Sequence, residues 1–81
     1  MKPVKIRFRR MKGKLGLAHL ERWEITLHPD QSETSLLGTA IHEVLHLEQW
    51  DLSEEAILRM EKSIVDVLLR LGFRLTEKDG E

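Results

Sequence analysis

The residues from 42 to 46 combine two histidines and a glutamate at a spacing that suits metal chemistry. The segment reads His-Glu-Val-Leu-His, an HExxH motif. On a helix, residues four positions apart lie on one face, so His42 and His46 can each offer a ring nitrogen to a single ion. Glu43 is offset by one position and borders the ion instead of binding it. It is therefore placed to accept a proton from a water molecule whose pKa zinc brings down toward about 7.

The bland alternative is that this spacing arose by chance and carries no chemistry. Two features of the sequence argue against chance. The segment has the periodicity of a helix on independent grounds, and both histidines lie roughly opposite the centre of its apolar stripe, where packing makes little demand for them. We therefore interpret His42 and His46 as metal ligands and Glu43 as a general base.

A catalytic zinc ion usually has three protein ligands and one open position, so a third ligand is needed. Glu61 is the expected ligand, because a helical projection places it inside an apolar stripe, where an unpaired carboxylate is costly. An ion pair with Arg22, or extension to the rim of the helix, is the alternative for Glu61. Glu54 is a weaker candidate because it belongs to the first turn of its helix. A swing of His28 into the site as a fourth ligand would make the site structural.

The elements that must position these residues follow from the pattern of the chain. Alternating apolar and basic residues from Val4 to Phe8 predict a strand, and residues 17–22 and 23–28 predict two more. A helix should begin between residues 31 and 35 and carry the HExxH motif to about residue 49. A second helix should run from Ser53, its N-cap, to about Leu71, with Gly72 as the left-handed residue that ends it. The expected fold class is α+β, a three-stranded sheet followed by two packed helices.

Length and composition set the limits within which this fold must be stable. The chain has 81 residues and no cysteine, so one domain, residues 1–81, is expected, and disulfide bonds and thiolate zinc sites are excluded. A domain of this size buries only about 60% of the surface of its unfolded chain, and a metal ion is a candidate for the missing stabilisation. With no apolar run suited to a signal peptide or a membrane span, we expect a soluble, cytoplasmic protein without a membrane partner.

Basic residues are concentrated at the start of the chain. The formal net charge is −1, yet seven cationic residues precede the first acid, Glu21: Lys2, Lys5, Arg7, Arg9, Arg10, Lys12 and Lys14. Such a row could contact nucleic acid. Outward Lys and Arg on an edge strand more often prevent edge-to-edge pairing, so a solvated face is favoured and nucleic acid is not the expected partner.

The second half of the chain resembles a known family. Residues 42–69, HEVLHLEQWDLSEEAILRMEKSIVDVLL, are similar to the C-terminal half of small HExxH metallopeptidases encoded by tailed bacteriophages, which belong to the zincins. The resemblance covers roughly residues 24–72. It implies a zinc peptidase of the host cytoplasm, acting on a peptide or protein, with His42, His46 and Glu61 as ligands and Glu43 as base. A glutamate recurs on the second helix of such sequences after a leucine, and Met60-Glu61 matches that place.

Two departures from the zincin pattern bear on function. Larger zincins supply a histidine, tyrosine or arginine that stabilises the oxyanion, and this chain has no tyrosine. His19, His28 and Arg22 are the candidates for that role. The chain is also too short for a second lobe, so a shallow site, a homodimer or a partner subunit is expected. The rival interpretation is a zinc-stabilised structural or binding module without turnover.

Overall fold

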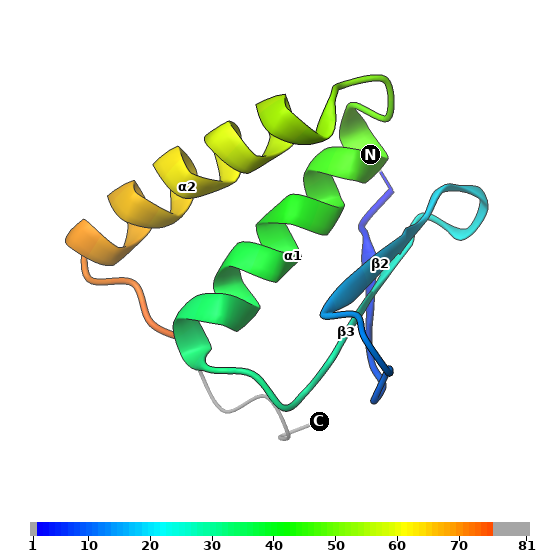
Figure 1. Ribbon diagram of the computed structural model, residues 1–81, viewed down its shortest axis with the longest axis horizontal. Coiled ribbons are helices and arrows are strands. Elements are labelled where there is room, and N and C mark those ends of the chain that lie inside the picture. Colours follow the sequence, from blue (N-terminus) through cyan, green and yellow to red (C-terminus); the bar gives the residue numbers. More distant parts are fainter. Residues whose placement is uncertain (1, 76–81) are drawn as a thin grey trace.

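The computed structural model describes residues 2–75 and contains three strands followed by two helices (Figure 1). The α+β fold class predicted from the sequence is confirmed. In chain order the elements are β1 (Lys5–Phe8), β2 (Gly16–His19), the short 3-10 helix η1 (Leu20–Arg22), β3 (Glu24–Leu27), α1 (Glu33–Glu48) and α2 (Glu54–Arg70).

The three strands form one mixed sheet in the order β1-β3-β2, with β3 parallel to β1 and antiparallel to β2. Because side chains alternate along a strand, Ile25 and Leu27 of β3 face the helices and are buried, while Glu24 and Thr26 point to the other face. The sheet thus has an apolar inner face under α1 and a polar outer face.

The second predicted strand is shorter than expected. Strand character ends at His19, and Leu20 to Arg22 turn instead into η1. Trp23 ends this turn in the left-handed conformation, with φ of 51°, and its N–H donates to the carbonyl of Leu20. This reversal allows β3 to run antiparallel beside β2.

Both helices begin after a serine N-cap, and the cap of α2, Ser53, is the one predicted from the sequence. The hydroxyl oxygen of Ser32 accepts from the N–H of Ser35 at 3.1 Å, and that of Ser53 accepts from the N–H of Ala56 at 3.1 Å. Gly72 follows α2 with φ of 92°, as predicted for the residue that ends the helix. Neither helix in residues 2–75 is long and apolar enough to cross a membrane.

Helix α1 lies in the middle of the structure, with the sheet against one side and α2 against the other (Figure 1). The core joins Ile25 and Leu27 to Leu36 and Leu47 of α1. On α2, Ile57 is fully buried. Ile64, which belongs to the apolar stripe expected around Glu61, is 39% exposed, because α2 rests mainly on α1 and leaves part of that stripe uncovered.

The connection between the two helices decides which residues can meet. Only residues 49–53 separate α1 from α2, so α2 turns back along α1 (Figure 1). The first turn of α2 consequently lies beside the last turns of α1, which carry the HExxH motif.

Candidate metal centre

His42 and His46 lie one turn apart on α1 and point toward α2. Their Nε2 atoms are 3.2 Å apart, and their rings meet edge to face at a centroid distance of 4.8 Å. Their side chains are 15% and 30% exposed, respectively. The i, i+4 spacing therefore brings the two ring nitrogens together at a partly sheltered position, as the sequence predicted.

Glu54, in the first turn of α2, completes a cluster with the two histidines. Its Oε1 lies 2.9 Å from Nε2 of His46, and its Oε2 lies 3.3 Å from Nε2 of His42. One ligand atom from each of the three side chains lies within 4.8 Å of the others, so the group could hold a metal ion. Sequence reasoning set Glu54 aside as a first-turn residue; the short connection between the helices is what brings it to the histidines.

The spacing of these atoms fits zinc. Tetrahedral zinc with bonds of about 2.0–2.1 Å to nitrogen and oxygen separates its ligand atoms by about 3.3 Å. The two Nε2 atoms, 3.2 Å apart, are close to that value, and the two oxygens of Glu54 reach one ring each, Oε1 at 2.9 Å from His46 and Oε2 at 3.3 Å from His42. Two imidazoles and a carboxylate are also a donor set found in catalytic zinc sites. The residues present therefore suit a zinc ion by both geometry and chemistry.

Glu61, the third ligand predicted from the sequence, lies on the other side of the His42 ring. Its Oε1 is 2.9 Å from Nδ1 of His42, and its side chain is 23% exposed. The half-buried carboxylate thus pairs with His42 and not with Arg22, which lies beside Glu24 at 3.8 Å. A carboxylate in this position fixes the ring orientation of a metal-binding histidine. Direct coordination by Glu61 stays a prediction.

Glu43 lies on the side of α1 that faces β2. A Cβ atom at Gly16 would lie 2.9 Å from Cγ of Glu43, so the lack of a side chain at Gly16 makes room for this glutamate. Burial raises the pKa of Glu43, and the neighbouring His42 and His46 oppose part of that rise. A carboxylate with a raised pKa exchanges protons more readily near neutral pH, which suits a general base.

Opposing influences act on His42. Burial lowers its pKa, but the hydrogen bond to Glu61 and the negative charges of Glu43, Glu54 and Glu61 outweigh this and raise the pKa overall. Since a histidine must be neutral to bind a metal, protons would compete with any metal ion that His42 binds.

A cleft of about 390 Å³ opens beside His42 and Glu43. It lies across α1, with the start of β2 on one side and Leu58 and Glu61 of α2 on the other. Lys14 is the only Lys or Arg residue among those that line it. The cleft gives a substrate access to the proposed base and leaves one cation within reach of it.

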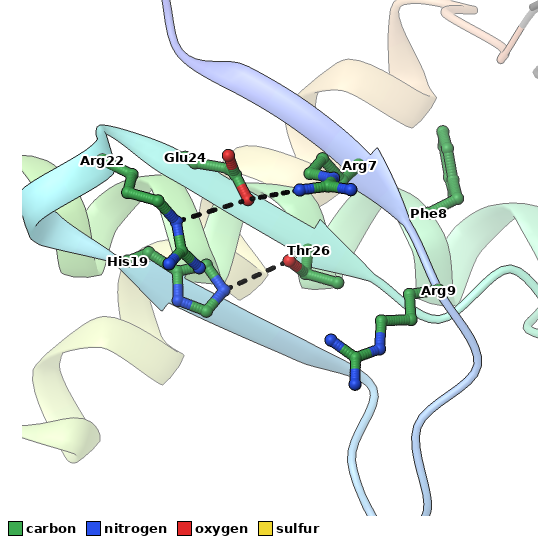
Figure 2. Close-up of a pocket in the computed structure, with 7 residues that line it drawn as sticks. All are labelled: Arg7, Phe8, Arg9, His19, Arg22, Glu24 and Thr26. Atoms are coloured by element: carbon green, nitrogen blue, oxygen red, sulfur yellow. Dashed lines mark hydrogen bonds and ion pairs between the residues drawn. The ribbon is translucent and has the colours of Figure 1, made fainter.

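The three oxyanion candidates expected from the sequence lie elsewhere. His19 pairs with Thr26 at 3.2 Å, and both it and Arg22 lie on the outer face of the sheet (Figure 2). His28, the possible fourth ligand, accepts from the N–H of Asp30 through Nδ1 at 3.2 Å. It does not belong to the His42, His46 and Glu54 group identified within residues 2–75. None of the three lines the cleft.

Comparisons with known proteins do not extend this assignment. No family model, no curated protein and no solved structure matches the chain. The functional interpretation therefore depends on the geometry of the site and on the residues that carry the resemblance described above.

Proposed function

We propose that this chain is a zinc-dependent hydrolase and that its substrate is a peptide or protein. The observation that carries the proposal is the convergence of His42 and His46 with a carboxylate of α2, at separations suited to zinc, beside the open cleft that Glu43 lines. A metal site with a neighbouring base and open access has what hydrolysis requires. The cytoplasm stays the proposed location.

The proposed ligands are His42, His46 and Glu54, and Glu61 is the proposed hydrogen-bond partner that orients His42. This division is supported by the Nε2 atoms of both histidines, which face Glu54, whereas Glu61 faces Nδ1 of His42. The competing assignment, Glu61 as third ligand, is the one expected from the sequence and from the family resemblance. The two assignments predict different metal contents for variants of the two glutamates.

In the proposed mechanism Glu43 moves the protons. Zinc, when bound, supplies Lewis acidity that polarises a substrate carbonyl and makes water more acidic. Glu43 accepts the proton of the attacking water and then donates it to the leaving amine. The raised pKa of Glu43 favours the first of these steps, because a more basic carboxylate accepts a proton more readily. Lys14, at the cleft, can offset negative charge that develops on the carbonyl oxygen.

The position of β2 supports a peptide as substrate. β2 pairs with β3 along one edge, and within the described part of the chain its other edge has no strand partner. The cleft begins at Lys14, Leu15 and Gly16, directly before and at the start of β2. An extended peptide can pair with such a free edge through main-chain hydrogen bonds, which would carry it past Glu43.

A second candidate function is a zinc-stabilised structural module. The observation that favours it is that two α2 carboxylates, Glu54 and Glu61, both contact His42. If both bound zinc together with the two histidines, four protein ligands would leave no open position, as in structural sites. Such a site would stabilise the fold without turnover.

The decisive experiment combines metal analysis with hydrolysis of casein and of a peptide library. The zinc-loaded wild type should hold one zinc ion per chain and cleave at least one substrate. Glu43→Gln should keep the zinc and lose about 10²- to 10⁴-fold in rate, the usual contribution of general acid–base catalysis. Equal rates for Glu43→Gln and wild type would remove the proposed mechanism. A zinc-loaded wild type that is inactive on all substrates would favour the structural module.

A further inference from the structure

A second hollow lies on the outer face of the sheet, on the side away from the helices (Figure 2). Its volume is about 210 Å³. Its charged and polar lining comes from all three strands and from η1: Arg7, Arg9, His19, Arg22, Glu24 and Thr26. Three guanidinium groups face one carboxylate, so the hollow carries an excess of positive charge.

The three guanidinium groups have donors to spare. Arg7 and Arg22 share the carboxylate of Glu24 at 3.9 and 3.8 Å, which is longer than a hydrogen bond. Arg9 has no ion pair or side-chain hydrogen bond within residues 2–75, and neither Arg7 nor Arg22 makes a side-chain hydrogen bond there. Each guanidinium carries five N–H donors in a planar fork that matches phosphate and carboxylate groups. The hollow therefore contains several N–H donors that are available to bind an anion.

Glu24 holds the hollow in shape. Its side chain is only 7% exposed and lies on the central strand, β3, within reach of both Arg7 and Arg22. Figure 2 shows Arg22 approaching it from one side and Arg7 from the other, so that a single buried carboxylate aligns two arginines from different elements. This arrangement positions positive charge before a ligand arrives, which lowers the entropy lost on binding.

The positive charge continues along β1. Lys5 and Arg7 alternate with apolar residues, and Arg9 extends the row beyond the end of the strand, where its backbone N–H still bonds to Leu27. Residues two apart in a strand lie on one face and are separated by about 6.6 Å. This separation is similar to that of consecutive phosphates along a nucleic-acid strand, so a row of such cations can follow a phosphate backbone.

We propose that this outer face binds the phosphate groups of a nucleic-acid strand, with Arg7, Arg9 and Arg22 as phosphate contacts and Glu24 as a positioning residue. The charge pattern in the sequence favours a solvated face. The structure adds a hollow in which Arg22 joins Arg7 and Arg9. The site is distinct from the metal centre, which lies between α1 and α2 beyond the inner face of the sheet. Contacts to phosphate carry no base preference, so binding is tolerant of sequence.

The test measures the affinity of the full chain for a fluorescently labelled single-stranded oligonucleotide at several salt concentrations. Three phosphate contacts predict that log K falls against log salt with a slope of about −2. Arg9→Gln, which breaks no contact within the protein, should weaken binding and make the slope shallower by about 0.7. Glu24→Gln, which removes the carboxylate charge that aligns Arg7 and Arg22, should weaken binding in a variant that retains the wild-type circular dichroism spectrum. Tighter binding by this variant would contradict the positioning role, because loss of negative charge alone would then explain the change.

Arg59→Gln is the matched control, since Arg59 is exposed on α2 and its substitution changes the net charge by the same amount as Arg9→Gln. It should leave affinity and salt slope as in wild type. The proposal is overturned if Arg59→Gln weakens binding as much as Arg9→Gln, because total charge would then explain the effect. It is also overturned if no oligonucleotide binds at low salt, or if polyglutamate competes as well as the oligonucleotide. Competition by inorganic phosphate in the wild type, reduced in Arg9→Gln, supports it.

Discussion

A Cβ atom at Gly38 would lie 2.7 Å from Oε2 of Glu61, so the missing side chain on α1 is what admits this carboxylate from α2. Glu61 in turn lies 2.9 Å from Nδ1 of His42. A glycine inside a helix costs about 1 kcal/mol relative to alanine. At this position the glycine gives up helix stability and lets Glu61 reach His42, a proposed metal ligand.

Gly38→Ala should therefore weaken zinc binding without unfolding the protein. The added methyl group displaces Glu61 from His42, and loss of such a partner typically lowers metal affinity by about 10- to 100-fold. Competition with a chromophoric chelator measures the change. In a Glu61→Ala background the same substitution should have no further effect, because the group with which it clashes is gone. Unchanged zinc affinity in Gly38→Ala would show that the carboxylate does not support His42.

Metal content should separate the roles of the two α2 glutamates. Glu54→Gln should lose stoichiometric zinc, since it removes a proposed ligand, whereas Glu61→Gln should keep zinc with an affinity lower by about 10- to 100-fold. Glu55→Gln, an exposed neighbour of Glu54, is the control and should match wild type. If Glu61→Gln lost zinc and Glu54→Gln kept it, Glu61 would be the ligand, as the sequence predicted.

The contrast between Glu43 and Glu54 shows how far sequence reasoning reaches. His42, Glu43 and His46 lie on one helix, and helical periodicity is local, so their relative placement could be predicted from spacing. Glu54 belongs to another helix, and its position depends on how α2 packs on α1. The five residues between the helices could have indicated the position of Glu54, because a short connection forces the first turn of α2 beside the end of α1.

The sheet shows the same limit. Alternation predicts which residues of a strand share a face, but it does not predict which strands are neighbours. The order β1-β3-β2 pairs Ile6 with Ile25 across nearly twenty residues of chain. Such long-range pairing depends on the whole core and not on the local pattern. The turn of η1 could not be predicted either, because it depends on the left-handed conformation of Trp23, and tryptophan rarely adopts that conformation.

Removal of zinc should lower the melting temperature markedly. Zinc at 1,000 times its dissociation constant stabilises the folded state by about 4.1 kcal/mol. For a domain of this size each kcal/mol corresponds to about 4–8 °C, so chelation should lower the melting temperature by more than about 10 °C. Thermal unfolding followed by circular dichroism, before and after chelation and zinc return, measures this. His46→Ala is the control and should show little response to the chelator.

The metal-free protein should lose stability as pH rises through neutrality. The pKa of His42 is raised in the folded state, so its contribution is complete below its unfolded pKa and is lost as pH rises through the folded pKa. Glu43 acts in the same direction in the acidic range, since its folded pKa is also raised and its ionisation opposes folding. Urea unfolding with chelator present, repeated at several pH values, measures the trend.

Zinc should reverse that trend, because protons compete with the metal for His42 and the stabilisation by zinc grows with pH. The difference in unfolding free energy between zinc-loaded and metal-free protein should thus widen from acidic to neutral pH. Metal-free His42→Gln should lose most of the slope near neutral pH. A metal-free wild type whose stability increases through neutrality would contradict the role assigned to His42.

Lys14 should matter for turnover and not for metal binding. It is the one Lys or Arg among the residues that line the cleft beside Glu43, and none of the oxyanion candidates expected from the sequence lines it. Lys14→Gln should therefore lower kcat by about tenfold, less than the 10²–10³ lost with a buried oxyanion donor, since solvent screens an exposed lysine. Zinc content should stay at one ion per chain. Lys12→Gln, in the same loop but outside the cleft, should keep the wild-type kcat, and Lys14→Arg should retain more activity than Lys14→Gln. If Lys12→Gln and Lys14→Gln lose the same activity, the effect comes from the charge of the loop and Lys14 has no specific part in the reaction.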